Sequence, residues 1–240
     1  MSERIERIGG GGILYDDALI GRMDETVFAV RSRGDEIRSS RGLAGRGHTL
    51  VISVEGRSCV RRHYYRGGRM RLFSEDAFLY TGEDRTRSFR EWRLLAELRR
   101  RDLPVPRPVA ARYLRRGALY AADLITERLP DVESLAVRLA SGLLPADRWR
   151  TVGATVARFH DAEVFHADLT AHNIQLANDG RVYILDFDRG RIMANSGAWK
   201  TRNLRRLHRS LRKINRQDGA HCDDRDWSDF IAGYSAPPPR

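Results

Sequence analysis

The sequence predicts an α+β fold in which a β-rich first half is followed by a mainly helical second half. The stretch TLVISVEGRSCVRRHY contains two β-forming runs around Glu55-Gly56, which predicts a hairpin over 50–65. A further strand, ALYAADLITE, is expected over 118–127. After Leu129-Pro130 the apolar residues recur at a spacing of three and four, which is typical of helices. The change in periodicity places a boundary between the two halves at this point.

The remaining elements follow from local patterns. Residues 1–40 contain a glycine run and little periodicity, so only weak strands are expected there. Residues 85–101 carry apolar side chains at near-helical spacing and are followed by three prolines, which predicts a helix that ends before them. Three more helices are expected, over 132–139, 145–159 and 200–216.

The chain is long enough to bury a core, and its composition is that of a folded protein. It has 240 residues, of which 41% are hydrophobic and 31% charged. We expect one domain with an N-lobe over 1–128 and a C-lobe over 129–240. No run is long and apolar enough for a spanning helix, and the N-terminus does not read as a secretory signal, so we expect the protein in the cytoplasm.

The charge balance predicts an anionic partner. A formal net charge of +11 favours nucleotides, nucleic acid or an anionic lipid surface. Lys200 and Lys213 are the only lysines, so the positive charge is almost all arginine, which suits bidentate phosphate contacts. A genome that favours arginine codons would give the same composition. The two cysteines are too few for a disulfide framework or a cysteine-rich zinc site.

The segment FHADLTAHNIQLANDGRVYILDFD, residues 165–188, is the richest in candidate catalytic groups. Two β-like runs flank Asp179-Gly180, which predicts a two-residue hairpin turn with both central residues at positive φ. In that register facing residue numbers add up to 359, so Asn173 would face Asp186 with Cα atoms about 4.5 to 5.5 Å apart. Asp168 lies five residues before Asn173 and within reach of the same place.

Three oxygen-bearing side chains at the open end of an apolar hairpin suit Mg²⁺, which completes its shell with substrate phosphates. Two would bind the metal, Asn173 and Asp186, while Asp168 accepts a proton from the acceptor. This division of roles predicts ATP-dependent phosphoryl transfer. The competing interpretation is that Asp168 and Asn173 only cap turns, as these residue types commonly do.

Several motifs resemble those of kinases. HADLTAHN is similar to the kinase catalytic loop His-x-Asp-x-x-x-x-Asn, and DFD is similar to the magnesium-binding Asp-Phe-Gly. The resemblance implies a protein-kinase-like two-lobed fold, with one helix in a β-rich N-lobe and a shortened, mainly helical C-lobe. It implies that Glu91, in RSFREWRLLAEL, pairs with the basic residue that binds phosphate. The glycines of RGLAGRGH lie where a phosphate-covering loop belongs, although an ordinary flexible turn explains them equally well (Gly42, Gly45 and Gly47).

A more specific resemblance covers roughly residues 40–215. RHYYRGG, RTRSFREWRLLAEL, LPVPRPVAA, RFHDAEVFHADLTAHNI and DFDRGR together resemble the bacterial 3-deoxy-D-manno-octulosonic acid (Kdo) kinases of lipopolysaccharide core synthesis. The resemblance implies transfer of the ATP γ-phosphate to the 4-hydroxyl of a Kdo residue on Kdo-lipid A precursor. It also implies a peripheral location on the inner face of the bacterial inner membrane.

The chain departs from protein kinases in two ways. No lysine precedes Lys200, so the strand lysine that contacts the α- and β-phosphates is absent. Arg62 is the expected substitute, Arg61 is a rival for the role, and a plain surface arginine is the third interpretation. The chain also ends 54 residues after Asp186, which leaves little room for protein-docking helices and favours a non-protein acceptor.

Two further features leave alternatives open. The helix expected over 200–216 is basic all around its apolar stripe, which suits an anionic membrane or glycolipid, a solvated face or, least of all, nucleic acid. His160, His166 and His172 recur every six residues, a spacing that fits no zinc motif, so we expect His166 to brace the catalytic loop instead. The alternative functions are a kinase of another small molecule or of protein, and an inert kinase-like module that binds nucleotide or RNA.

Overall fold

The computed structural model describes residues 2–29, 49–65, 76–193 and 197–236. The chain forms two compact units. The first comprises Met1–Ser40, Ala44–Glu97 and Pro106–Arg128, and the second comprises Arg41–Leu43, Leu98–Val105 and Leu129–Arg240. The first unit is built on an antiparallel sheet and the second mainly on helices, so the α+β, kinase-like fold that the sequence predicts is confirmed.

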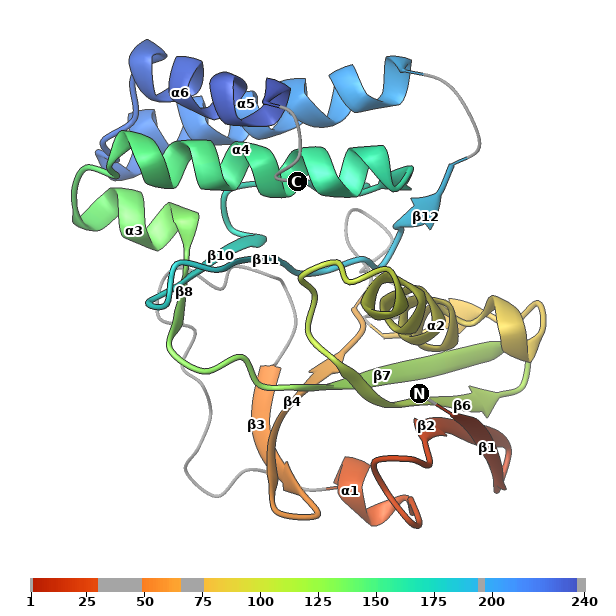
Figure 1. The fold of residues 1–240 in the computed structure, drawn as a ribbon. Helices are drawn as coiled ribbons and strands as arrows, with labels where there is room; N and C mark the ends of the chain where they lie inside the picture. The colour runs from red at the N-terminus through yellow and green to blue at the C-terminus, as the bar shows by residue number, and fades with distance from the viewer. Residues whose placement is uncertain (1, 30–48, 66–75, 194–196, 237–240) are drawn as a thin grey trace. The chain divides into compact units, whose positions relative to one another are not determined.

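The sheet of the first unit has the strand order β1-β2-β6-β7-β4-β3, and β5 pairs with β7 (Figure 1). The predicted hairpin over 50–65 is confirmed, with Glu55 and Gly56 both at positive φ in a two-residue turn and Arg61 and Arg62 on its second strand. The strands are β1 (Glu3–Ile8), β2 (Gly11–Asp16), β3 (Thr49–Val54), β4 (Arg57–His63), β5 (Phe78–Leu79), β6 (Pro108–Arg116) and β7 (Leu119–Glu127).

Strands β1 and β2 form a regular antiparallel pair, where the sequence predicts only weak strands. Gly11 and Gly12 are buried within β2, where the strand approaches β6 closely: a Cβ added at Gly11 would lie 2.1 Å from the carbonyl oxygen of Tyr113. Where the sequence favours a weak strand, the chain forms α1 (Thr26–Ala29), and Phe28 packs into the core beneath the sheet. The strand expectation at this position is wrong, because these residues form a single helical turn that buries Phe28.

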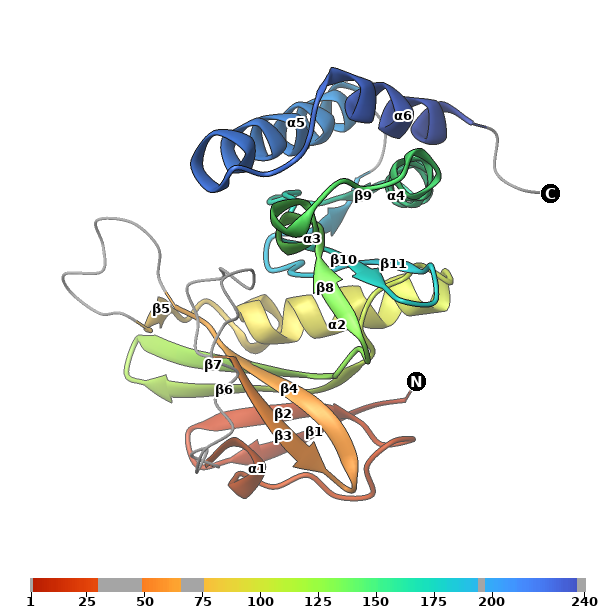
Figure 2. The same cartoon turned by 90° about the vertical axis from the view of Figure 1, so that its left-hand side faces the viewer.

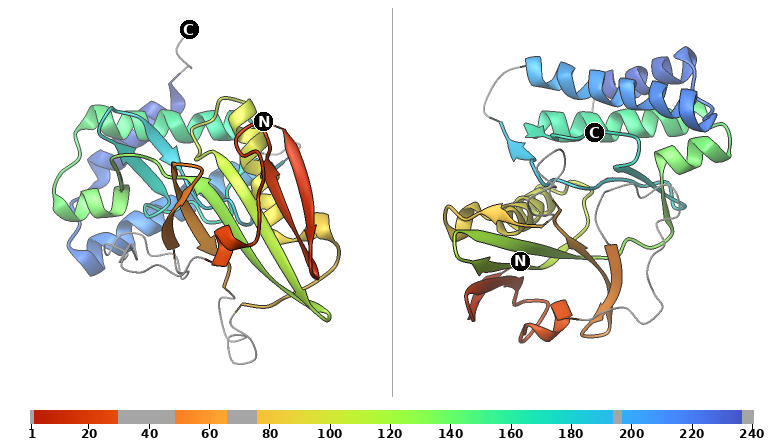
Figure 3. Two further views of the ribbon diagram at one scale, coloured as in Figure 1. Left: turned by 90° about the horizontal axis from the view of Figure 1, so that it is seen from below. Right: turned by 180° about the vertical axis from the view of Figure 1, so that it is seen from behind.

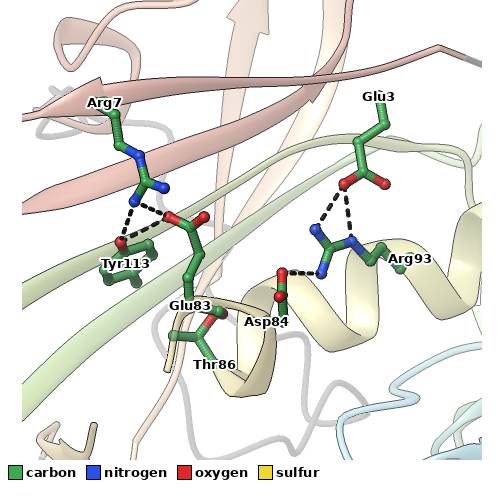
Figure 4. Close-up of polar contacts among 7 residues, drawn as sticks. All are labelled: Glu3, Arg7, Glu83, Asp84, Thr86, Arg93 and Tyr113. Atoms are coloured by element: carbon green, nitrogen blue, oxygen red, sulfur yellow. Dashed lines mark hydrogen bonds and ion pairs between the residues drawn. The ribbon is translucent and has the colours of Figure 1, made fainter. Parts of the chain in front are cut away.

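Helix α2 (Arg87–Arg100) is confirmed close to the predicted bounds, and it lies along β6 and β7 (Figure 2). Its apolar stripe is buried against the sheet, and Ser88 Oγ donates to the Arg112 carbonyl at 2.9 Å. The 3-10 turn η2 (Glu83–Arg85) precedes it. In Figure 4, Glu83 accepts hydrogen bonds from Arg7 and Tyr113, and Arg93 joins Asp84 to Glu3 of β1. These contacts fix the start of α2 on the sheet.

In the second unit α4, α5 and α6 lie side by side (Figure 3). Helices α4 and α6 approach closely at two glycines: a Cβ added at Gly153 would lie 2.0 Å from the Phe230 carbonyl oxygen, and one at Gly233 would lie 2.0 Å from that of Arg150. The helices are α3 (Leu135–Ser141), α4 (Ala146–Asp161), α5 (Ala198–Asp218) and α6 (Asp224–Ser235). The strands are β8 (Val132–Ser134), β9 (Val164–Phe165), β10 (Ile174–Ala177), β11 (Val182–Ile184) and β12 (Arg191–Ile192).

The helix expected over 132–139 is partly wrong. Residues 132–134 form β8, which pairs with β10, and the Ser134 side chain then caps α3 by accepting the Val137 N–H at 3.2 Å. Strand β6 and helix α6 are not among the elements that the sequence predicts. Helix α4 begins one residue later and ends two residues later than its predicted range of 145–159, and α5 extends two residues beyond each end of its predicted range of 200–216.

Candidate functional site

The hairpin formed by β10 and β11 exists, but its register differs by one residue from the prediction. Ile174 faces Ile184 and Leu176 faces Val182, and the Ala177 N–H donates to the Arg181 carbonyl at 2.9 Å. The loop therefore has three residues, 178–180. Of Asp179 and Gly180, the two residues predicted to form the turn, only Gly180 has a positive φ, at 94°. A three-residue loop that ends in a left-handed glycine is a common alternative to the two-residue turn, and sequence alone did not distinguish them.

The register change alters which residue faces Asn173. The Leu185 N–H donates to the Asn173 carbonyl at 2.8 Å, so Leu185 rather than Asp186 is the partner of Asn173. Asp186 follows with φ at 63°, an uncommon conformation for a residue other than glycine. The alternation of the strand ends there, and the backbone turn rather than strand pairing sets the direction of the Asp186 side chain.

His166 links the loop that carries Asp168 to the end of β11. Its Nδ1 accepts the Asp168 backbone N–H at 3.1 Å, and its Nε2 lies 2.8 Å from the Leu185 carbonyl oxygen. The two partners require the neutral tautomer with hydrogen on Nε2. Burial lowers the pKa of His166, while the Leu185 carbonyl and the carboxylates of Asp186 and Asp168 act in the opposite direction. Both carboxylates thus act electrostatically on the same imidazole.

Asn173 contacts the same loop directly. Its Nδ2 donates to the backbone carbonyl of Asp168 at 2.8 Å, which turns the amide oxygen away from that carbonyl. The Asp168 side chain is half exposed, at 52%, and Asn173 and Asp186 are partly buried. Asn173 is therefore joined to Asp168 by a hydrogen bond, and Asp186 lies close enough to His166 to act electrostatically on its imidazole.

Asn203 of α5 is a buried residue that is not among the site residues predicted from the sequence. Its Nδ2 donates to the His166 carbonyl at 2.8 Å, and its Oδ1 accepts the His166 N–H at 3.3 Å. The same Oδ1 lies 3.4 Å from Nε2 of His160, whose Nδ1 contacts the Tyr234 hydroxyl at 2.8 Å. Burial lowers the pKa of His160 to about 4. The bracing role expected for His166 thus extends through α5 to α4 and α6.

Arg206 of α5 forms an ion pair with Asp168. Its Nε donates to Asp168 Oδ1 at 2.8 Å, and its Nη2 contacts the same oxygen. One turn further on, Ser210 Oγ accepts the Ala171 N–H at 3.2 Å. Asn203, Arg206 and Ser210 recur every three or four residues, so one side of α5 follows the loop from His166 to Ala171. The signal in the sequence was this polar pattern beside the apolar stripe.

In the first unit Arg62 of β4 pairs with Glu91 of α2. Arg62 Nη2 lies 2.5 Å from Glu91 Oε2, and the Tyr64 hydroxyl donates to the same oxygen at 2.6 Å. The Glu91 side chain is only 2% exposed, and burial and the Glu91 carboxylate raise the pKa of Tyr64 well above its usual value. Arg61, the rival candidate, instead donates to the Phe28 carbonyl. Gly42, Gly45 and Gly47 lie outside the described residues.

The donor atoms suit a metal that is bound together with its nucleotide. Within the described ranges, no group of three or more His, Cys, Asp or Glu side chains is arranged to hold a metal ion. The predicted ligands of Mg²⁺ are one amide oxygen and one carboxylate, from Asn173 and Asp186. Magnesium commonly takes one or two protein carboxylates and completes its shell with phosphate oxygens and water, so this small set fits it.

Comparisons with known proteins support one assignment. The model of the lipopolysaccharide kinase (Kdo/WaaP) family matches residues 31–234. The chain is 41% identical over 228 residues to a 3-deoxy-D-manno-octulosonic acid kinase of Xanthomonas euvesicatoria pv. vesicatoria, a match that covers 94% of this chain and 90% of the relative. It is also 41% identical over 229 residues to a protein of the same name from Stenotrophomonas maltophilia, with the same coverage of both chains.

Proposed function

Because the chain belongs to the lipopolysaccharide kinase (Kdo/WaaP) family, we propose that it transfers the γ-phosphate of ATP to the 4-hydroxyl of a Kdo residue on Kdo-lipid A precursor. The observation that supports the proposal is that His166 and Asn173 hold the backbone of Asp168, while the Asp186 carboxylate acts electrostatically on the same His166 imidazole. A chain that only bound nucleotide or RNA would have no need for these three residues to be held together.

Asp168 is the group that orients the acceptor hydroxyl and takes its proton. Arg206 occupies Oδ1 of this carboxylate, so Oδ2 is the oxygen available to the acceptor. The backbone of Asp168 is held at both ends of the residue, by His166 at its N–H and by Asn173 at its carbonyl. Fixing the carboxylate before substrate binds removes part of the entropic cost of reaching the reactive geometry.

The phosphates of ATP require positive charge from the protein. In this proposal Asn173 and Asp186 hold Mg²⁺, which when bound neutralises charge shared by the β- and γ-phosphates. Arg62 contacts the α- and β-phosphates, and the buried Glu91 carboxylate holds its guanidinium in place. Gly42, Gly45 and Gly47 are proposed to cover the phosphates.

The basic face of α5 is proposed to hold the protein on the anionic inner face of the bacterial inner membrane, where a glycolipid acceptor would lie. Seven arginine and lysine side chains of the helix are exposed: Arg202, Arg205, Arg206, Arg209, Arg212, Lys213 and Arg216. None of the helices described is long and apolar enough to span a bilayer. A peripheral attachment uses the charge without a membrane anchor.

The experiment that tests the proposed function is mass spectrometry of Kdo-lipid A precursor after incubation with the protein, ATP and Mg²⁺. The expected result is one added phosphate on the Kdo residue, located at the 4-hydroxyl by fragmentation. Phosphorylation of a generic protein or of another sugar, with none on Kdo, would favour a kinase of different specificity. No ATP consumption, together with salt-sensitive RNA binding, would favour an inert binding module.

A further inference from the structure

A stripe of positive charge runs along α5 past the proposed catalytic base. Arg202, Arg206, Arg209 and Lys213 follow one another at spacings of four, three and four, so they share one side of the helix, and all four are exposed. Arg206 stands within this stripe and is the member that contacts Asp168. The neighbouring side of the helix is fixed to the loop by Asn203 and Ser210. The position of Arg206 beside Asp168 is therefore set by the fold.

The ion pair uses only one edge of the Arg206 guanidinium. Nε and one Nη donate to a single carboxylate oxygen, Asp168 Oδ1. A guanidinium has five N–H donors and a second edge, formed by its two Nη atoms, that matches a carboxylate. Within the part of the chain that the structure describes, no protein group engages that second edge. The Arg206 side chain is 45% exposed, so this edge is accessible to a ligand.

Stability alone does not account for the pair. Both side chains are about half exposed, at 45% and 52%, and ion pairs exposed to this extent contribute little to folding because water screens them. An arginine fixed on the catalytic carboxylate instead suits the recognition of a second anion. It holds a second anion at a defined distance from the hydroxyl that Asp168 activates.

We propose that Arg206 binds the carboxylate of the acceptor sugar acid through its second guanidinium edge, and so selects an acidic sugar over a neutral one. The proposal rests on the proposed function, because the relatives are named as kinases of an octulosonic acid. Such an acid is ionised at neutral pH. Its carboxylate is attached to C2 and the accepting hydroxyl to C4 of the same sugar. One guanidinium therefore orients both the base and the acceptor.

The test compares two acceptors and four proteins. The acceptors are Kdo-lipid A precursor and the same molecule with the Kdo carboxylate converted to a primary amide, which keeps the shape but removes the charge. The proteins are the parent, Arg206→Gln, Arg206→Lys, and Arg225→Gln as a control that removes another exposed arginine, from α6. Initial rates give kcat, the KM for acceptor and the KM for ATP, and circular dichroism checks the fold of each protein.

For the parent and for Arg225→Gln, the amide is expected to raise the acceptor KM by ~10- to 100-fold, the range for one charged hydrogen-bonded pair. Arg206→Gln should show the same increase with the natural acceptor and no further increase with the amide, while its KM for ATP stays unchanged. Arg206→Lys should recover part of the discrimination, since it restores charge without the planar edge.

Two outcomes would overturn the inference while leaving the proposed function intact. In the first, the amide raises the acceptor KM of Arg206→Gln as much as it raises that of the parent. In the second, Arg206→Gln raises the KM for ATP and not the KM for the acceptor, which would assign Arg206 to the transferred phosphate. Failure of the parent protein to phosphorylate either acceptor would instead refute the proposed function, and the inference with it.

Discussion

Nδ1 of His166 lies 3.1 Å from the backbone nitrogen of Asp168 and accepts its N–H. This bond requires an unprotonated Nδ1, because a protonated imidazole has no acceptor. The ring is buried, and its Nε2 is engaged by the Leu185 carbonyl. The proposed base and the residue before Asp186 are thus held by one neutral side chain. The site should therefore be sensitive to protonation of His166 and to substitution of the residues that support His166.

Stability should fall as the pH falls below the usual histidine pKa. Burial lowers the pKa of both His160, to about 4, and His166, so the unfolded chain binds protons below pH ~6.5 that the folded chain does not. Their contribution is complete above pH ~6.5 and is lost progressively as the pH falls, for His160 through pH ~4. For His160 the loss is at most roughly 3 kcal/mol. Urea unfolding of the parent and of His160→Gln at pH 7.5 and 5 measures it.

The control in that experiment separates His160 from the carboxylates, which also titrate in acid. His160→Gln should reduce the change in unfolding free energy between pH 7.5 and 5, because it removes the buried imidazole of His160 and leaves that of His166. An identical change in unfolding free energy for parent and variant would show that His160 is not the group responsible.

Removing the Asn203 side chain should impair both folding and turnover. Asn203→Ala leaves the buried N–H and carbonyl of His166 without side-chain partners, which should cost about 2 to 4 kcal/mol. Because His166 then loses its support, kcat should fall by up to ~100-fold with little change in the KM for ATP. Chemical unfolding and steady-state kinetics measure the two effects.

Asn215→Ala is the matched control for Asn203. Asn215 lies on the same helix, and its amide likewise contacts the backbone of one residue, Cys222, away from the catalytic loop. It should reduce stability without reducing kcat at a temperature where both variants are folded. Equal losses of kcat in the two variants would mean that stability, and not the position of His166, explains the effect.

Arg62 and Arg61 are adjacent on β4 and differ in their partners, which makes them a controlled pair. Arg62→Gln should raise the KM for ATP by ~10- to 100-fold, because its guanidinium is proposed to contact phosphate and is held by Glu91. Arg61→Gln removes the same charge from a residue that contacts the Phe28 carbonyl. It should change that KM by less than about threefold. Similar increases in the KM for ATP in both variants would show that the effect comes from the loss of one positive charge and not from a specific contact of Arg62.

Reversing charge on α5 should release the protein from anionic vesicles. The test uses Arg205, Arg209 and Arg212, all changed to Glu, and leaves Arg206 in place because it contacts Asp168. Each basic residue near an anionic surface contributes about 1 kcal/mol, so three reversals should abolish binding in a sedimentation assay. The control reverses three exposed arginines of the first unit, Arg4, Arg22 and Arg116. Equal release by both triple variants would contradict a specific role for α5.

The sequence identified the elements that carry the site because their signals are local. Glu55-Gly56 and Asp179-Gly180 both marked hairpins, and the prolines after α2 marked its end. The predicted register of the hairpin formed by β10 and β11 was wrong by one residue, because a glycine that needs a positive φ is equally compatible with two-residue and three-residue loops. The conformation of Asp186 then determines its direction, and no local pattern predicts a left-handed aspartate.

The contacts missed from the sequence join residues that are far apart in the chain. Arg206 lies 38 residues from Asp168, and Asn203 lies 37 from His166. Before the packing of α5 against the loop is known, Arg206 is one of many arginines on a basic helix. Asn203 was the more visible signal, since it is a polar residue next to the apolar stripe that α5 buries.

The most direct test of the account is the turnover of Asp168→Asn with Kdo-lipid A precursor, ATP and Mg²⁺. The substitution keeps the size of the side chain and the backbone bonds to His166 and Asn173, so the fold and ATP affinity should be unchanged. Loss of the proton acceptor should lower kcat by ~10²- to 10⁴-fold. A kcat within about threefold of the parent would remove Asp168 from its proposed role and contradict the mechanism.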